Sequence, residues 1–351
     1  MISQDEQTQN DYIHTLSQSS REVKNLEYWA SHIEDPWLPA ILSLDYGGIR
    51  SCSTLLILES LMHEIWEAEQ KHGGLAEGIT EKDLLPCHYF DFMYGTSTGG
   101  LIAIFLSRLR RPISEALFFS RRVAHDTLTK KRSIIPLGTK YYPQPLERAF
   151  KNIIAQHCPN HPNCTGESDP FLWPTQGYPF NPTNPRVSQT ACRVTKGKDF
   201  INTCIFRSFP CQIFPREKAA DELPIWKVAL ATTATLFYLP AVSHNGSLYQ
   251  DGAPSESNPS FSAYGDFHTL YGNTKPALLL SLGAGVPDAG LCIPPGLGFL
   301  LKEVRLRSRC RRMFSCGAIG WRNYLIRRGR IGGCVFVQMG RRGIRGSILW
   351  G

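Results

Sequence analysis

Three short runs of the chain hold residue types that together could carry out acyl transfer. The first, Gly95-Thr96-Ser97-Thr98-Gly99, reads G-x-S-x-G, a pattern typical of a nucleophilic serine on a tight turn between a strand and a helix. The second, Asp251-Gly252-Ala253, places a carboxylate beside small residues, and the third, 44–50, contains two adjacent glycines. A nucleophile, a base and a pair of backbone amides are the minimum set for this chemistry. The sequence therefore predicts an enzyme.

The base that would serve Ser97 has two candidates. Asp251 could take the proton directly, because partial burial raises a carboxylate pKa from its ordinary value of about 3.9 toward the working range of a base. A Ser-His-Asp arrangement would need a histidine after Asp251, and His268 is the one available there. The run 266–269 around His268 is interpreted as an ordinary loop, so we favour a Ser97–Asp251 dyad and keep the triad as the alternative.

The third run, Leu44-Asp45-Tyr46-Gly47-Gly48-Ile49-Arg50, offers an oxyanion hole. Two consecutive glycines can turn their backbone N–H groups toward one point, where the tetrahedral intermediate would carry its negative charge. Asp45 and Arg50 border the glycines, and Arg50 could fix the loop or meet a phosphate headgroup. Dinucleotide binding is not favoured, because Tyr46 and Ser51 stand where that pattern needs glycines.

The elements that must position these runs follow from hydrophobic patterning. Short apolar runs predict strands, and apolar residues at helical spacing predict amphipathic helices. The predicted strands lie at 41–44, 89–94, 201–206 and 277–282. The predicted helices lie at 58–65 (ending near 73–74), 101–109, 146–154 and 226–234. This alternation predicts an α/β fold with a mainly parallel sheet.

Composition divides the chain into three parts. Residues 1–39 are predicted to form a polar N-terminal extension, and 40–285 the main domain, with its motif-bearing part at 42–265 and a Pro-rich insertion at 158–190. The net charge of +8 is concentrated in 286–351, where 13 Lys and Arg stand against 2 Asp and Glu. This tail is interpreted first as a poorly ordered extension and second as a patch for anionic lipid headgroups; nucleic-acid binding is the third reading and is not expected.

Cellular location is constrained by what the sequence lacks. The polar N-terminus has no apolar segment typical of a signal peptide, and no stretch reaches the length of a membrane span. The eleven cysteines form no disulfide framework. We therefore expect a cytoplasmic protein whose contact with membranes is peripheral.

The three runs, in this order, resemble the patatin-like phospholipase family, most closely its fungal or plant-type cytosolic members. That family has an Asp-Gly-Gly-Gly-x-Arg-Gly loop, a Gly-x-Ser-x-Gly turn and an Asp-Gly-Gly/Ala motif, and the resemblance covers roughly residues 40–285. It implies a three-layer α/β/α fold and hydrolysis of lipid esters, with a phospholipid or acylglycerol as substrate. It also implies roles for the matching residues. Those are Ser97 as nucleophile, Asp251 as proton acceptor, Gly47 and Gly48 as oxyanion donors, and Asp45, Arg50, Gly95, Gly99, Gly252 and Ala253 as supporting motif residues.

The dyad chemistry needs no metal, and the sequence has no acidic loop suited to calcium, so we expect calcium-independent activity without a cofactor. His157, Cys158, His161 and Cys164 suit zinc by type, but their spacing matches no common zinc finger, so no metal site is expected. Tyr46 and Ser51 replace the first and last glycines of the family loop, and Leu230 stands where an arginine is usual. These departures motivate a further alternative, a catalytically impaired lipid-binding or regulatory protein.

Overall fold

The structure of the protein is a computed structural model. It describes residues 39–73, 75, 77–129, 139–157, 163–172, 189–197, 202–209, 223–272, 275–284, 333–337, 339–340 and 343–344. The predicted N-terminal extension, most of the Pro-rich insertion and most of the basic tail therefore lie outside the described residues.

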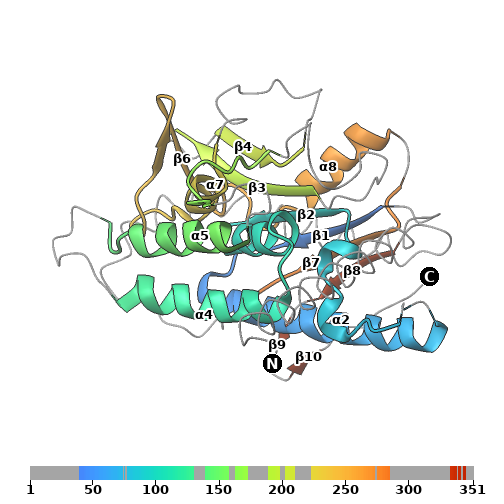
Figure 1. Cartoon of the computed structure of the whole chain (residues 1–351). Coiled ribbons are helices and arrows are strands. Elements are labelled where there is room, and N and C mark those ends of the chain that lie inside the picture. Colours follow the sequence, from blue (N-terminus) through green and yellow to red (C-terminus); the bar gives the residue numbers. More distant parts are fainter. Residues whose placement is uncertain are drawn as a thin grey trace, which may run out of the picture.

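Within the described part of the chain, a mixed eight-stranded sheet forms the centre of the fold (Figure 1). The strand order is β5-β6-β3-β2-β1-β7-β8, and β4 pairs with β3. The strands of this sheet are β1 (Ala40–Leu44), β2 (Phe92–Thr96), β3 (Gln189–Lys196), β4 (Asn202–Arg207), β5 (Val242–His244), β6 (Ser247–Asp251), β7 (Leu278–Leu282) and β8 (Gly333–Val337). The run from β3 through β2, β1 and β7 to β8 is parallel, whereas β4, β5 and β6 pair antiparallel. A separate antiparallel pair joins β9 (Met339–Gly340) to β10 (Gly343–Ile344).

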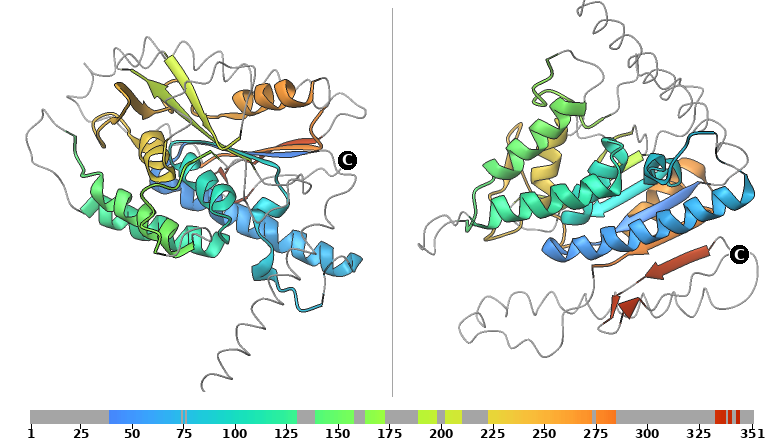
Figure 2. Two further views of the ribbon diagram at one scale, coloured as in Figure 1. Left: turned by 45° about the horizontal axis from the view of Figure 1, so that its top comes forward. Right: turned by 60° about the horizontal axis from the view of Figure 1, so that its bottom comes forward.

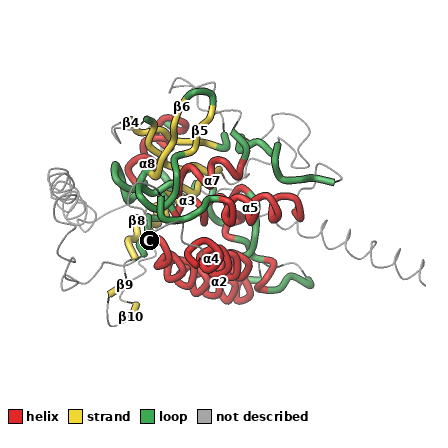
Figure 3. Tube along the Cα trace, turned by 90° about the vertical axis from the view of Figure 1, so that its left-hand side faces the viewer, coloured by secondary structure: helices red, strands yellow, loops and turns green. Residues whose placement is uncertain are grey.

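Helices cover both faces of the sheet, which gives the three layers visible in Figures 1 and 2. One face carries α2, α3, α4, α5 and α7, and the other carries α8. Helices α2 and α4 pack against each other, as the view in Figure 3 shows. The helices are α2 (Ser51–His72), α3 (Thr98–Ala103), α4 (Ile113–Thr129), α5 (Gln144–His157), α7 (Ile225–Thr233) and α8 (Ser260–Tyr271). Short 3-10 turns are η1 (Gly48–Arg50), η2 (Glu81–Asp83) and η3 (Pro86–His88), and a π-helical turn, η4 (Ile104–Arg108), continues α3.

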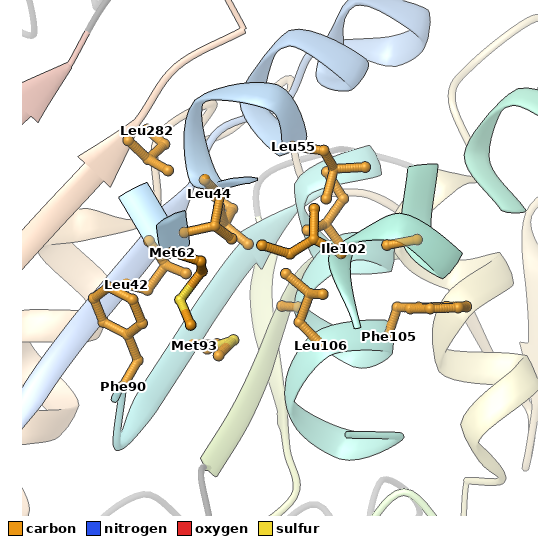
Figure 4. Packing of buried hydrophobic residues seen from close by; sticks show 14 of the residues in the cluster. Leu42, Leu44, Leu55, Met62, Phe90, Met93, Ile102, Phe105, Leu106 and Leu282 are labelled. Carbon is orange, nitrogen blue, oxygen red and sulfur yellow. The ribbon is translucent and has the colours of Figure 1, made fainter. Parts of the chain in front are cut away.

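The alternation of side chains along the inner strands builds separate cores on the two faces. Leu42 and Leu44 of β1 point into the cluster under α2 and α4, whereas Ile41 points into the cluster under α8. Figure 4 shows side chains from β1, β2, β7, α2 and the α3–η4 segment meeting in the first of these clusters. Strands buried on both faces read as continuous apolar runs, which explains Leu278–Leu282 and Ala40–Leu44.

The α/β class and the three-layer architecture predicted from the sequence are confirmed. The predicted strands at 41–44, 201–206 and 277–282 and the four predicted helices are present within a few residues. The strand predicted at 89–94 begins only at Phe92, since η3 precedes it. The loop predicted around His268 is wrong, because that residue lies in α8. The sheet also continues past residue 285 through β8, which pairs with β7.

Candidate active site

Ser97 occupies the turn between β2 and α3, as the G-x-S-x-G pattern predicts. Its backbone has φ 58° and ψ −125°, a conformation that residues with a side chain rarely adopt. Strain of this kind persists where the surrounding structure enforces it, and it is typical of functional turns. The Ser97 backbone N–H donates a hydrogen bond of 3.0 Å to Thr232 Oγ1 of α7, which fixes the turn from the side.

The glycines around Ser97 are required by close backbone approach. A Cβ at Gly95 would lie 2.2 Å from the carbonyl oxygen of Gly99, and a Cβ at Gly99 would lie 2.3 Å from that of Leu44. No side chain fits at such distances without moving the backbone. The strand β1, the turn and the start of α3 are therefore packed directly backbone to backbone, and the serine is held rigidly.

Asp251 ends β6 and lies beside Ser97, although 154 residues separate them in the chain. Strand β3 joins the two, because its Arg193 is opposite Thr96 and its Val194 is opposite Asp251. Ser97 Oγ donates a hydrogen bond of 2.7 Å to Asp251 Oδ2. Both side chains are buried, with Ser97 6% and Asp251 1% exposed. The structure thus brings together the two residues that the sequence predicts as nucleophile and proton acceptor.

Asp251 is supported by two further donors. The Thr235 hydroxyl also donates to Oδ2, and the Ala253 backbone N–H donates to Oδ1 over 2.9 Å. Burial raises the pKa of the Asp251 carboxyl, while the hydrogen bonds from Thr235, Ala253 and Ser97 act in the opposite direction. Burial makes Asp251 a stronger base, and the hydrogen bonds that it accepts hold its carboxylate in place.

The same tight packing explains why small residues occupy positions 252 and 253. A Cβ at Gly252 would lie 2.6 Å from the Arg193 carbonyl oxygen, so the chain beyond Asp251 needs glycine to pass β3. Ala253 contributes through its backbone N–H, which explains why a small residue is sufficient there.

The loop after β1 places Gly47 and Gly48 beside the serine turn. Gly48 has φ +57°, and a Cβ at Gly47 would lie 2.3 Å from Ala284 Cβ, so each position needs glycine for its own reason. Both backbone N–H groups converge on Thr98 Oγ1, at 3.2 Å from Gly47 and 2.9 Å from Gly48. Two amides that converge on one acceptor beside the serine have the geometry expected of an oxyanion hole.

The two replaced glycines of the family loop are accommodated differently. Tyr46 is not among the residues with positive φ; it is exposed and donates its backbone N–H to the Ser257 carbonyl over 3.0 Å. A tyrosine here would be strained if the loop required a positive φ at this position. It does not, so Tyr46 causes no such strain. Ser51 is buried at the start of α2, and its hydroxyl is 2.7 Å from Thr98 Oγ1.

Three further residues singled out by the sequence surround this loop. Asp45 lies under it with a buried Oδ1, and burial raises the pKa of its carboxyl to about 7, against the lowering effect of a hydrogen bond from Asn258. Arg50 ends η1, and its backbone N–H donates to the Gly47 carbonyl. Leu230 is buried in α7 within the apolar cluster that contains β3 and α5, where its side chain contributes to packing.

The alternative base and the alternative metal site find no support in the part of the chain that the structure describes. No hydrogen bond joins a histidine there to Ser97 or Asp251, and His268 faces the Tyr264 ring at 6.1 Å between centroids. No group of His, Cys, Asp and Glu suited to a metal ion occurs among those residues. Cys158 and His161 lie outside them. Cys164 instead donates to Asp169 over 3.1 Å.

Sequence reasoning missed Thr98, Thr232, Thr235 and Ser51 as site residues. Each acts through a hydroxyl that reaches another segment of the chain, and threonine and serine at such positions give no sequence pattern of their own. In this region the sequence singles out only Leu230, which stands where an arginine is usual. The three threonines at 232, 233 and 235 were the one available signal.

Fold and site together define an α/β protein with a serine turn, a neighbouring carboxylate and convergent amides. The family model for patatin-like phospholipase matches residues 42–264, so the chain belongs to this family. It is 24% identical over 285 residues to human calcium-independent phospholipase A2-gamma, covering 77% of this chain and 31% of that protein. It is 26% identical over 272 residues to patatin-like protein 2 of Arabidopsis thaliana, covering 71% and 60% respectively.

The chain thus spans about a third of the phospholipase A2-gamma relatives and a fifth of Arabidopsis phospholipase A I, which is 23% identical over 287 residues. These relatives come from animals and plants, and the predicted fungal or plant-type subgroup stays a prediction. Within the described residues, no helix is long and apolar enough to cross a membrane.

Proposed function

We propose that the protein hydrolyses the carboxylic ester of a phospholipid or acylglycerol with Ser97 as nucleophile and Asp251 as proton acceptor. The hydrogen bond of 2.7 Å between Ser97 Oγ and Asp251 Oδ2 is the observation that carries this proposal. A serine hydroxyl is a weak nucleophile until a base takes its proton. The family supports a lipid-hydrolysing enzyme, and the low identity to each relative leaves the substrate class to this proposal.

In the first half of the reaction, Asp251 takes the proton as Ser97 Oγ attacks the ester carbonyl. The carbonyl oxygen becomes an anion, which the backbone N–H groups of Gly47 and Gly48 bind. The intermediate collapses when the bond to the leaving alcohol breaks, and the proton held on Asp251 passes to that alcohol. A lyso-lipid or partial glyceride leaves, and the acyl group stays on Ser97.

In the second half, Asp251 accepts a proton from water as the water oxygen attacks the acyl-enzyme. The same amides bind the second oxyanion, and collapse returns the proton to Ser97 and releases the fatty acid. No step in this scheme uses a metal ion. We therefore propose that activity is calcium-independent, as the printed name of the human relative states for that protein.

The direct test is release of fatty acid from vesicles that contain both phospholipids and acylglycerols, with and without a chelator. We expect the wild type to release fatty acid in either condition and Ser97→Ala to release none. Ser60→Ala is the matched control, because Ser60 is an exposed serine of α2 whose hydroxyl donates to the Leu56 carbonyl. A folded wild type that binds vesicles but releases nothing would favour the alternative of a catalytically impaired lipid-binding protein.

We also propose that the 236–238 loop (Leu236, Phe237 and Tyr238) contacts the lipid surface. All three side chains are exposed, and they follow Thr235, which contacts Asp251. Phe237 has φ +67°, a strained conformation that points to a functional constraint. Lys140 lies over the Tyr238 ring at 5.4 Å, so a cation accompanies the apolar surface. Apolar and aromatic side chains beside a lysine suit the boundary between headgroups and acyl chains.

Two backbone hydrogen bonds join the 236–238 loop to the segment at 140–141. The backbone N–H of Lys140 donates to the Phe237 carbonyl over 2.8 Å, and that of Tyr141 donates to the Tyr238 carbonyl over 2.9 Å. Phe237→Ala should lower vesicle binding about thirtyfold, since burial of a large apolar side chain is worth roughly 2 kcal/mol. Phe261→Ala is the matched control, because Phe261 is 74% exposed but lies on α8 at the other face of the sheet. Equal binding by both variants would contradict the proposed contact, as measured by sedimentation with vesicles.

A further inference from the structure

The point at which the amides of Gly47 and Gly48 converge already holds an oxygen atom of the protein. Thr98 Oγ1 accepts both N–H groups, at 3.2 and 2.9 Å. Thr98 immediately follows Ser97 and is half-buried. An oxyanion that binds these two amides must take the place of the threonine hydroxyl.

The Thr98 hydroxyl forms a third hydrogen bond, with Ser51 Oγ, and the number of donors and acceptors decides which of the two oxygens donates. A threonine oxygen has two lone pairs and one proton. Both lone pairs are engaged by the two amides, so the proton is directed to Ser51 Oγ, 2.7 Å away. Ser51 is 5% exposed at the first residue of α2, and its oxygen is therefore a fixed acceptor.

We infer that Thr98 is an internal placeholder for the oxyanion and that Ser51 holds it in that position. The inference rests on the proposed function and adds a positioning residue to it. Before the tetrahedral intermediate forms, the Thr98 side chain rotates about χ1, releases both amides and gives up its bond to Ser51. Ser51, which replaces the last glycine of the family loop, thereby controls how readily the oxyanion hole opens.

The exchange of acceptors favours the transition state over the bound substrate. A neutral hydroxyl and a neutral ester carbonyl are comparable acceptors, so substrate binding alone gains little by displacing Thr98. A charged oxygen forms hydrogen bonds about twice as strong as neutral ones. The hole therefore opens mainly for the developing anion, and breaking the hydrogen bonds of Thr98 adds to the barrier of that step.

Removing either hydroxyl of the Ser51–Thr98 pair should open the hole. In Ser51→Ala, the Thr98 proton loses its acceptor and the resting position becomes less stable. In Thr98→Ala, the placeholder is absent. We expect each variant to react about threefold to tenfold faster with a fluorophosphonate, whose phosphoryl oxygen occupies the oxyanion position, because a neutral hydrogen bond contributes roughly 0.5–1.5 kcal/mol. kcat/KM for a soluble 4-nitrophenyl ester should rise by a similar factor.

The two substitutions should not add, because they act through one bond. Ser51→Ala is expected to accelerate labelling in the wild-type background and to have no effect in the Thr98→Ala background. Ser53→Ala is the matched control: Ser53 lies on the same turn of α2, and its hydroxyl donates to the Arg50 carbonyl and not to Thr98. If Ser51→Ala does not fold, Thr98→Ala carries the test alone.

The outcomes separate this inference from the proposed function. If the wild type is labelled at Ser97, but both variants react at the wild-type rate or more slowly, Thr98 supports the glycine loop and is not a placeholder. In that case the inference is overturned and the proposed function stands. If the folded wild type neither labels at Ser97 nor releases fatty acid, the proposed function itself fails.

Discussion

Two carboxylates flank the serine turn, one in the loop after β1 and one at the end of β6. Burial raises the pKa of both Asp45 and Asp251. Their donors differ, however. Asp251 receives hydrogen bonds from Ser97, Thr235 and Ala253, whereas Asp45 Oδ1 has no hydrogen-bond partner among the described residues.

Hydrogen-bond donors therefore influence what a buried carboxyl can do. The three donors to Asp251 favour its ionised form and oppose the effect of burial, which suits it to accept the Ser97 proton. Asp45 has fewer donors, and its pKa of about 7 keeps a large part of it protonated near neutral pH. We infer that Asp251 serves the reaction and that Asp45 serves the structure of the glycine loop.

The largest expected effect is that of removing the base. Asp251→Asn keeps the volume of the side chain and an oxygen acceptor but cannot take the Ser97 proton. Because a positioned base contributes roughly 10²–10⁴-fold, fatty-acid release should fall by about 10³-fold. Asp126→Asn, an exposed change on α4, is the control. A folded Asp251→Asn that retains a tenth of the activity would remove Asp251 from the mechanism.

A smaller effect is expected when one donor to the base is removed. In Thr235→Val, Asp251 Oδ2 loses a hydrogen bond that favours its ionised form, so the pKa of Asp251 rises further. The base is then protonated up to a higher pH. The acid limb of kcat/KM against pH should move upward by about 0.5–1 unit, since one hydrogen bond is worth roughly 1 kcal/mol.

At pH values above the acid limb, kcat/KM of Thr235→Val should approach that of the wild type. The exposed Thr203→Val on β4 is the matched control. An unchanged acid limb in Thr235→Val would show that the donor does not tune the base.

The smallest expected effect on catalysis, and a clear one on stability, comes from Asp45. Between the ordinary pKa of 3.8 and about 7, the folded protein binds a proton here that the unfolded chain has released. Stability from this group is therefore complete below about pH 3.8 and is lost as pH rises from there to about 7, by roughly 4 kcal/mol in total. Asp45→Asn is neutral throughout, so its free energy of unfolding should fall less between pH 5 and 8.

Urea unfolding at several pH values checks the Asp45 prediction, with Asp126→Asn as the control. Parallel pH profiles for Asp45→Asn and the wild type would show that Asp45 is ionised in the folded protein. The contrast between the two carboxyls would then not hold.

The sequence predicts the fold class and the Ser97 turn because local rules decide both, whereas Asp251 is paired with Ser97 through the resemblance of three separate motifs. Gly95 and Gly99 are needed because backbone segments pass very close to each other at the serine turn. The inner strands are recognised because they are almost entirely apolar. The hydroxyls of Thr232 and Thr98 were not predicted, since their contacts depend on where α7 and the glycine loop lie in the folded chain.

Helix α8 was missed for a different reason. It contains Gly265, a poor helix former, and buries few residues, among them Ala263 and Phe267. Its helical pattern is correspondingly weak, and the sequence around His268 was interpreted as a loop. Packing against β1 and β2 stabilises this helix more than its own sequence does.

The most direct test of the central claim is mass spectrometry of the protein quenched during turnover of an ester with a known acyl chain. If Ser97 is the nucleophile, the peptide containing Ser97 gains the mass of that acyl group, and Ser97→Ala gains none. Fatty-acid release without any adduct on Ser97, or an adduct on another residue, would contradict it.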